Sequence, residues 1–453
     1  MQIIRKDHYI MCDNRDSLKV VKFGGSSLAD AEHFLQVKAI VEAEEGRRYV
    51  VPSAPGKRFP EDEKVTDMLY ECYRLADEEK DITPVFDRIR ERYQQIVDGL
   101  GIEVDLDTEF TNIKWAISHQ AGRDYAASRG EYLSGVILSK LLGYHFLDAA
   151  RIIKFSDNGK FDSEITNELV GAALGRHVHA VIPGFYGSMP NGTVKTFSRG
   201  GFDVTGSIVA RAAGADLYEN WTDVSGFMMA DPRIVKNPET IDVITYRELR
   251  ELSYMGAGVL HEDAIFPVRF AGIPINIRNT NRPEDAGTMI VAEANDSADA
   301  RKITGIAGKK GFSHINIEKD MMNAEVGFGR RVLEVLEREG ICFEHLPSGI
   351  DTMCVVVSTK DIEAIKDRVI DEIKKEVNPD SITLEDGLAL VAVVGRGMIK
   401  SAGSAAKVFG ALANAGINVR MIDQGSSELN IIIGVDEADY INALNAIYSE
   451  FMS

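Results

Sequence analysis

The feature of the sequence that most restricts the fold is an internal duplication in the last third of the chain. The segments 327–349 and 403–425 align without a gap at an offset of 76 residues. The recurring residues are Gly327, Val332, Leu336, Gly340, Ile341 and Gly349 in the first segment and Gly403, Val408, Leu412, Gly416, Ile417 and Gly425 in the second. In each segment a helical pattern ends at a glycine, and a strand-like run leads to another glycine. This register predicts two copies of a small α+β unit.

The region before the duplication has a different pattern, in which short apolar runs alternate with helical stretches. The runs that read as strands are 18–23, 144–147, 179–183, 216–221 and 273–277. Alternation of this kind over some 280 residues predicts a large, mostly parallel α/β sheet covered by helices. The polar segment 292–302 has no periodicity and is expected to link the two regions.

Charge and cysteine content exclude several classes of function. The chain of 453 residues has 51 Lys and Arg against 70 Asp and Glu, a formal charge of −19, which argues against nucleic-acid and anionic-membrane partners. Its 4 cysteines form no CxxC pair, so a disulfide scaffold and a zinc site are not expected. With no signal-like start and no apolar run long enough to span a membrane, we expect a cytoplasmic protein.

A glycine-rich loop follows the first predicted strand. Lys22 lies at the carboxyl end of the strand, and Gly24, Gly25 and Ser26 precede the next helical pattern. Glycines let backbone amides approach an anion, a helix N-terminus favours negative charge, and a lysine supplies a cation for phosphate. The pattern matches neither a P-loop nor a dinucleotide fingerprint. An ordinary strand-to-helix turn therefore stays an equal alternative.

Two further polar loops are candidates for ligand binding. Arg199 and Asp203 flank two glycines, and the forked guanidinium of an arginine suits a carboxylate. Thr222 and Asp223 end a strand-like run ahead of the Asp-Pro-Arg turn at 231–233, where polar groups could bind a nucleotide. A capped helix start and common turn chemistry explain the same two patterns without a ligand.

In order along the chain, these motifs resemble those of the aspartate kinases of the amino-acid kinase family. The matching segments are KFGGSS at 22–27, SRGE at 128–131, SRGGFD at 198–203, WTDVSG at 221–226, ADPRIV at 230–235 and ELSYMGAGVLHEDAIFP at 251–267. The duplicated region resembles the tandem ACT domains (βαββαβ) of these enzymes. The resemblance implies a kinase domain at 18–295 and a regulatory region at 303–453, where a first ACT unit at about 312–380 is nested in a second made of about 303–311 and 386–453.

The resemblance also implies an activity, which is phosphorylation of the side-chain carboxylate of L-aspartate by MgATP to give 4-phospho-L-aspartate, the first step toward lysine, threonine and methionine. Lys22 and Asp203 would be catalytic. The implied ATP ligands are Lys22, Gly24, Gly25, Ser26, Thr222, Asp223, Met228, Arg233, Gly258 and Val259. The implied aspartate ligands are Thr66, Glu131, Arg199 and Gly201, with Glu131 on the ammonium group and Arg199 on a carboxylate. Mg²⁺ would be held by the ATP phosphates, so no metal ligands are assigned.

The absence of a Ser/His/Asp or Cys/His constellation fits this chemistry. A carboxylate of pKa about 3.9 is already ionised at pH 7 and needs no general base to attack a phosphoryl group. The protein has to position two anions that repel each other and to neutralise charge on the transferred group. Lysine, arginine and glycine-rich loops supply these functions.

Two residues depart from the family pattern. Phe202 stands where the family usually has a serine, and Gly258 stands where it often has a lysine near the nucleotide. Two alternatives therefore stay open. The chain could be an amino-acid kinase for a different acidic substrate, or a catalytically weak ACT-based amino-acid sensor.

Regulation is expected at the ACT units, through an amino-acid effector bound between chains of a homodimer or a dimer of dimers. The positions that match the family's effector site are Met322, Gly327, Phe328, Glu344 and Ser348. A glutamate at 344 could hold the ammonium group at the end of a lysine side chain, which favours lysine as the effector. A solvated glutamate on a strand is the alternative.

Overall fold

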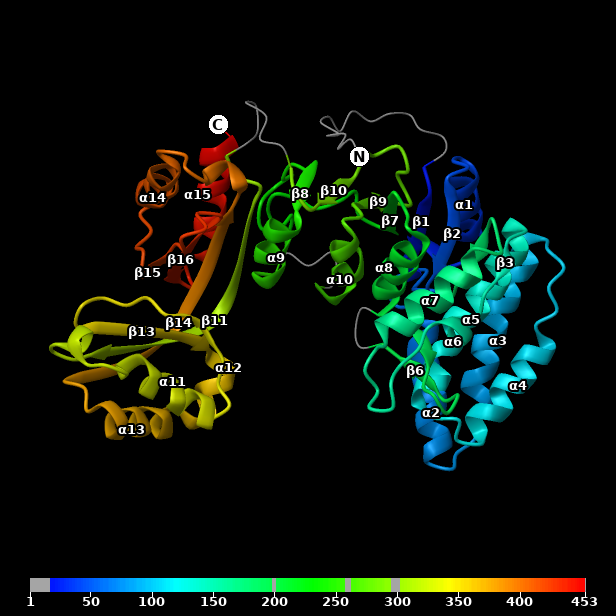
Figure 1. Cartoon of the computed structure of the whole chain (residues 1–453), viewed down its shortest axis with the longest axis horizontal. Helices are drawn as coiled ribbons and strands as arrows, with labels where there is room; N and C mark the ends of the chain where they lie inside the picture. Colours follow the sequence, from blue (N-terminus) through cyan, green and yellow to red (C-terminus); the bar gives the residue numbers. More distant parts are fainter. Residues whose placement is uncertain (1–16, 198–200, 257–261, 295–301, 453) are drawn as a thin grey trace, which may run out of the picture. The chain divides into compact units, whose positions relative to one another are not determined.

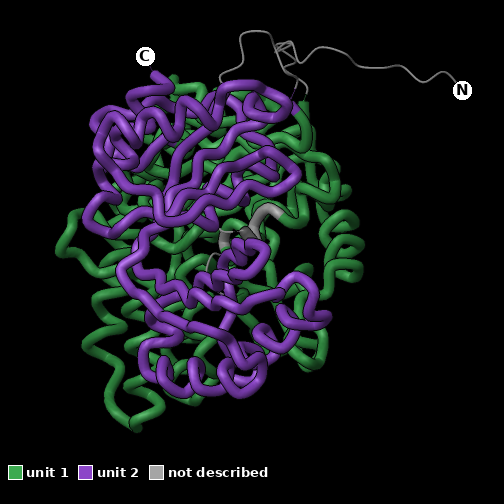
Figure 2. Tube along the Cα trace, turned by 90° about the vertical axis from the view of Figure 1, so that its left-hand side faces the viewer, with its two compact units in different colours: residues 1–227, 260–293 green, residues 228–259, 294–453 purple. Residues whose placement is uncertain are grey.

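The computed structural model of the chain describes residues 17–197, 201–256, 262–294 and 302–452. The chain forms two compact units, which Figure 2 shows in different colours. The first consists of residues 1–227 and 260–293, and the second of residues 228–259 and 294–453. Among the described residues, none of the helices combines the length and the apolar character that crossing a membrane requires.

The first unit is built on a mostly parallel sheet. Its strands follow the order β3 (His145–Phe146), β4 (Ala180–Val181), β2 (Arg47–Pro52), β1 (Lys19–Phe23), β7 (Leu217–Thr222), β9 (Ile275–Asn279) and β10 (Thr288–Val291). Every neighbouring pair among them is parallel except β9 with β10. β1 (KVVKF) lies between β2 and β7 and is buried along most of its length, with Lys22 among its buried residues.

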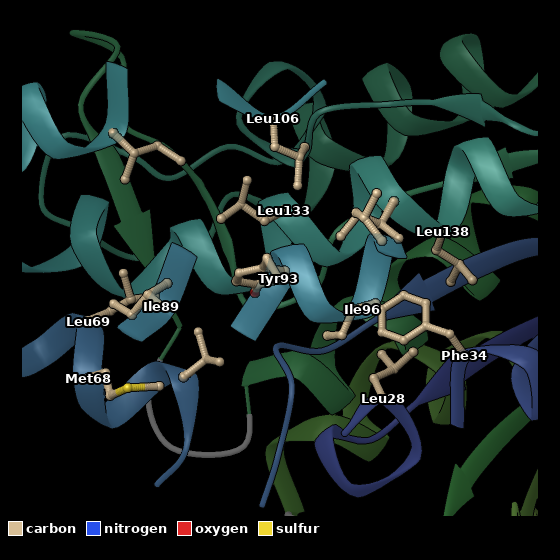
Figure 3. Packing of buried hydrophobic residues seen from close by; sticks show 14 of the residues in the cluster. Leu28, Phe34, Met68, Leu69, Ile89, Tyr93, Ile96, Leu106, Leu133 and Leu138 are labelled. Atoms are coloured by element: carbon tan, nitrogen blue, oxygen red, sulfur yellow. The ribbon is translucent and has the colours of Figure 1, made fainter. Parts of the chain in front are cut away.

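Helices pack around this sheet. They are α1 (Ala31–Glu42), α2 (Val65–Asp77), α3 (Thr83–Leu100), α4 (Asp107–Ser118), α5 (Arg123–Leu142), α6 (Ala149–Ile152), α7 (Ser163–Leu174), α8 (Gly201–Ala213) and α10 (Glu262–Ala271), with a hairpin of β5 (Tyr186–Ser188) and β6 (Val194–Thr196). Figure 3 shows Leu28, Phe34, Leu69 and Tyr93 within one large buried cluster. α3 has a proline in its first turn and is followed by Gly101, whose φ of 62° is left-handed, and both are common signals at helix ends.

The duplicated region of the second unit forms an antiparallel sheet. The strand order is β12 (Phe343–His345), β13 (Thr352–Ser358), β11 (Gly305–Glu318), β14 (Ser381–Val394), β16 (Asn430–Asp436) and β15 (Met421–Asp423). β11 and β14 are long, and they carry α11 (Phe328–Arg338) and α13 (Lys366–Val377) near one end and α14 (Ser404–Asn414) and α15 (Tyr440–Met452) near the other (Figure 1).

The internal duplication is visible in these elements. α11 and α14 begin and end at residues separated by the same 76 positions. Each follows a left-handed glycine, Gly327 with φ 83° and Gly403 with φ 90°. Residues 305–309 of β11 pair with β14, whereas residues 312–318 pair with both β13 and β14. The domain limits that the resemblance implies stay predictions.

Segment 228–259 of the second unit contains β8 (Val243–Thr245) and α9 (Tyr246–Tyr254). Glu248 of α9 is fully buried, and its carboxylate accepts hydrogen bonds from the hydroxyl groups of Thr245 and Thr304 and from the backbone and side chain of Arg396. Burial raises the pKa of Glu248, but hydrogen bonds led by the one from Thr304 outweigh it and lower this pKa below its ordinary value. A buried carboxylate thus connects α9 to two separate parts of the ACT region.

We predict that Glu248→Ala destabilises the second unit by about 3 kcal/mol, because it removes the buried acceptor to which Thr245, Thr304 and Arg396 donate. Urea unfolding of the full chain measures the change. The matched control is Glu251→Ala on the same helix, which removes one hydrogen bond from Asn430 and should cost about 1 kcal/mol. Equal losses in the two variants would contradict the prediction.

Candidate active site

A buried lysine lies near the carboxyl end of β1, in the middle of the parallel sheet. Lys22 is only 4% exposed. Its Nζ atom lies 2.6 Å from Oδ1 of Asp203, which is in the first turn of α8. The same Nζ donates to Oδ1 of Asn220 over 3.2 Å. The structure therefore brings together Lys22 and Asp203, which lie far apart in the sequence and which sequence analysis selected as catalytic.

Asn220 is a site residue that sequence analysis missed. It lies on β7 directly opposite Lys22 in the parallel register, and its Nδ2 donates to Oδ1 of Asp203 over 3.0 Å. The residue is buried on β7, next to the buried Glu219. Because buried polar side chains require hydrogen-bond partners, an asparagine in a central strand was the available signal.

The glycine-rich loop after β1 is held in place by its backbone. The amide of Gly24 donates to the carbonyl of Trp221 over 3.0 Å, and residues Gly25–Leu28 form one turn of 3-10 helix, η1. The hydroxyl group of Ser27 lies 2.6 Å from that of Thr280. A Cβ atom on Gly24 would lie 3.6 Å from Nζ of Lys22, so the backbone at this point is next to the cation. This arrangement is suited to an anionic ligand.

A buried carboxyl group faces the same region from α5. Glu131 is 2% exposed, and its Oε2 atom has no hydrogen-bond partner among the described residues. Burial raises the pKa of Glu131 to about 8, although the backbone of Ala54, in the loop after β2, lowers it through a hydrogen bond to the carboxylate. A buried group with an unused oxygen and a strongly raised pKa is a candidate for binding a cationic ligand group.

Of the other residues predicted to bind aspartate, the structure describes two. Thr66 is half-buried in the first turn of α2, and Gly201 is buried at the start of α8. A Cβ atom on Gly201 would lie 2.4 Å from that of Phe197, so a glycine is needed there. Arg199 lies outside the described residues.

The predicted nucleotide residues fall in both units. Thr222 ends β7 in the first unit and Asp223 follows it, and the hydroxyl group of Thr222 donates to the Asp223 carboxylate over 3.2 Å. Met228 and Arg233 belong to the second unit, where the 84% exposed guanidinium of Arg233 pairs with Asp231 at 2.6 Å. Gly258 and Val259 lie outside the described residues.

The five predicted effector residues belong to the second unit. Met322 and Phe328 are buried in the core beside α11, so only the backbone of Phe328 is available at the helix start. Gly327 is the residue before that helix, and Ser348 is exposed. The carboxylate of Glu344 accepts a hydrogen bond from the phenol of Tyr254 at the end of α9.

The arrangement in the first unit can hold two ligand groups of opposite charge. Lys22 and the amides around Gly24 are ligands for an anion such as phosphate. Glu131 can ionise to receive a cation. Among the side chains of the described residues, no group of three or more His, Cys, Asp or Glu is placed to bind a metal ion.

Comparison with known proteins gives matches along nearly the whole chain. The sequence profile of the amino acid kinase family matches residues 17–279, and a profile of the ACT domain matches residues 391–451. Aspartokinase 3 of Bacillus subtilis is 38% identical over 96% of this chain and 99% of its own length.

Solved structures give the same result. The aspartate kinase of Clostridium acetobutylicum is 52% identical, with a TM-score of 0.88 over 96% of this chain and 100% of that one. Aspartokinase III of E. coli in complex with aspartate and ADP is 24% identical, with a TM-score of 0.72 over 96% of this chain and 100% of that one, and shares the fold.

We predict that Glu131→Gln becomes increasingly more stable than the wild type as the pH rises from about 5 to 8. The raised pKa of Glu131 favours folding while the group is protonated, and this contribution is lost as the pH rises through about 8. The difference should reach a few kcal/mol, at about 1.4 kcal/mol per pKa unit. Urea unfolding without substrates at pH 5, 6.5 and 8 measures it.

The matched control for this experiment is Glu168→Gln, a change of an exposed glutamate on α7. Its stability difference from the wild type should not vary over this pH range. Parallel pH profiles for the wild type and Glu131→Gln would contradict the assignment of a buried, proton-bearing carboxyl group.

Proposed function

The chain belongs to the aspartokinases of the amino acid kinase family, and on that premise we propose that it transfers the γ-phosphoryl group of ATP to the side-chain carboxylate of L-aspartate. The observation that carries the proposal is the buried Lys22–Asp203 pair, which places a cation beside the glycine-rich loop. The product would be 4-phospho-L-aspartate, which leads toward lysine, threonine and methionine.

ATP would bind at the carboxyl end of β1. Lys22 faces the transferred phosphoryl group, and the backbone of Gly24, Gly25 and Ser26 holds phosphate oxygens. The pairing of Lys22 with Asp203 and Asn220 supports this role, because it fixes the direction of the ammonium group before the substrate arrives. Mg²⁺ would accompany the phosphates, which suits a loop composed of amides and a lysine, and would neutralise part of their charge.

Aspartate would bind between the loop after β2 and α5. Glu131 ionises to receive the α-ammonium group, and its unused Oε2 atom supports this role. Arg199 would bind a carboxylate, with Thr66 and Gly201 completing the site. The attacking carboxylate is ionised at neutral pH, so the protein aligns the two anions and does not remove a proton.

Control by an amino acid would come from the ACT region. The Clostridium relative is an allosteric enzyme. In this chain Glu344 bonds to Tyr254, and α9 leads directly into segment 257–261, which contains the predicted nucleotide positions Gly258 and Val259. A lysine effector whose ammonium group binds Glu344 would shift the population of two states by its differential affinity for them.

The remaining parts of the proposal concern assembly and location. Both edge strands of the ACT sheet are short and carry exposed apolar residues, Phe343 on β12 and Ile422 on β15. Such edges can pair with another copy, so we infer a homodimer or a dimer of dimers. We expect the protein in the cytoplasm.

Trapping the acyl phosphate as a hydroxamate tests the function. We predict that Lys22→Ala lowers kcat by about 100-fold or more, because it removes a preorganised cation at the transferred group. The matched control is Lys19→Ala at the other end of β1, whose lysine pairs with Glu44 and should leave kcat within about threefold.

The same assay separates the alternatives. ATP-dependent product from another acid but not from aspartate would indicate a different acidic substrate, for which Phe202→Ser is the companion variant. No product from any acid would indicate an ACT-based sensor. A Lys22→Ala variant that keeps more than about a third of kcat would show that the glycine-rich loop is only structural.

We predict that lysine inhibits the wild type and that Glu344→Ala raises the inhibition constant at least several-fold with nearly unchanged basal turnover, because the variant lacks the anion that binds the effector's ammonium group. The control is Tyr254→Phe, which removes the hydrogen bond but keeps the carboxylate and should keep lysine binding. Full inhibition of Glu344→Ala, or a wild type that does not respond to lysine, would remove this assignment.

A further inference from the structure

The guanidinium group of Arg92 is buried beneath two loops of the first unit. Arg92 lies on α3 and is 4% exposed. Its Nε and Nη2 atoms donate to the carbonyl of Ala29 over 3.1 and 2.8 Å, and Nη2 also donates to the carbonyl of Gly56 over 2.8 Å. Ala29 ends the glycine-rich loop after β1, and Gly56 belongs to the loop after β2. One side chain therefore binds the backbone of both loops.

The two loops touch each other directly through their backbones. The amide of Gly56 donates to the carbonyl of Gly25 over 2.7 Å. A Cβ atom on Gly25 would lie 2.9 Å from the carbonyl oxygen of Ala54, and one on Gly56 would lie 2.7 Å from the carbonyl carbon of Gly25. No side chain can stand between the loops at this contact. Their spacing is therefore set by the backbone contact and by Arg92.

An acidic residue fixes the position of the guanidinium group. Nη1 of Arg92 donates to Oδ2 of Asp62 over 2.7 Å, and Arg58 binds the same carboxylate through Nε at 2.8 Å. The hydrogen bonds from Arg58, and then from Arg92, hold the pKa of Asp62 well below its usual range. Asp62 lies between Gly56 and Thr66 in the sequence, so this bond also ties down the segment that leads to a predicted substrate ligand.

Each loop serves a different ligand in the proposed reaction. The loop after β1 follows Lys22 and would hold the ATP phosphates. The loop after β2 contains Ala54, whose backbone binds the carboxylate of Glu131, the residue expected to hold aspartate. The distance between the loops thus sets the distance between the two reacting groups.

We propose that Arg92 is a positioning residue for phosphoryl transfer, which fixes the spacing between the loop that binds the ATP phosphates and the loop that binds aspartate. This inference rests on the proposed function. Arginine suits the role because its planar fork reaches two carbonyl groups and a carboxylate at once, whereas a lysine offers one donor atom.

The role predicts a specific kinetic signature. Each substrate keeps its own ligands when the loops lose their spacing, so its affinity should change little. The attacking carboxylate should be less well aligned with the γ-phosphorus atom of ATP. A misplacement of about 1 Å can lower the rate by about 100-fold. We therefore expect Arg92→Lys to lower kcat by about 100-fold while both KM values, and the dissociation constants of ADP and aspartate measured by calorimetry, stay within about threefold.

The matched control is Arg47→Lys. Arg47 is equally buried at 4%, and it donates to the carbonyl of Ile40 over 2.6 Å and to the carboxylate of Glu219 over 2.8 Å, but it begins β2 at the opposite end of the strand from the loops. It should lose stability in urea and keep kcat within about threefold of the wild type. A loss of kcat in Arg47→Lys equal to that in Arg92→Lys would overturn the proposal, and so would an Arg92→Lys variant with wild-type kcat or with its loss confined to KM.

Asp62→Asn covers the case in which Arg92→Lys does not fold. It keeps both carbonyl contacts of Arg92 but weakens the bond that orients the guanidinium group, and it should lower kcat by about tenfold with unchanged KM values. Unchanged kcat in this variant would also overturn the proposal. An inactive wild type in the same series would refute the proposed function and the role of Arg92 with it, whereas an active wild type with an unaffected Arg92→Lys refutes only the role of Arg92.

Discussion

The parallel pairing of β1 with β2 and β7 is the constraint on which the rest of the first unit depends. It places Lys22 opposite Asn220 on one side and Val51 on the other, so three strands end at one edge of the sheet. Loops that follow parallel strands meet at such an edge, where ligands bind in open α/β sheets. The glycine-rich loop, the loop after β2 and the end of β7 are neighbours for this reason, and the backbone contact of Gly25 with Gly56 follows from it.

The buried polar groups near this edge differ in whether they have hydrogen-bond partners within the protein. Lys22, Asp203 and Asn220 form hydrogen bonds with one another, which keep the ammonium group in a fixed direction. Glu131 has an unused oxygen among the described residues and a raised pKa. A buried polar atom without a hydrogen-bond partner destabilises the protein while the site is empty. A ligand that forms the missing hydrogen bond offsets this desolvation penalty, which favours binding.

Much of this organisation could be predicted from local sequence signals. The duplication predicted α11 and α14 with the glycines that follow them, Gly340 and Gly416, and the alternating apolar runs predicted the parallel sheet. The fold class and the family inferred from the ordered motifs are confirmed. The same motifs identified Lys22 and Asp203, which the structure brings into contact, while the roles of the binding residues stay predictions. Asn220 and Arg92 could not be identified from the sequence, because neither belongs to a local motif.

The sequence by itself determined the elements, the glycines at their ends and the charged residues that the motifs carry, because these depend on periodicity and on backbone preferences of neighbouring residues. Only the tertiary structure decided which distant groups share a site. Asn220 meets Lys22 because β7 pairs with β1 in one register, and Arg92 meets Ala29 and Gly56 because α3 packs beneath their loops. The hydrogen-bond partners of a buried polar group are set by packing between segments far apart in the chain, so they cannot be predicted from a local sequence pattern.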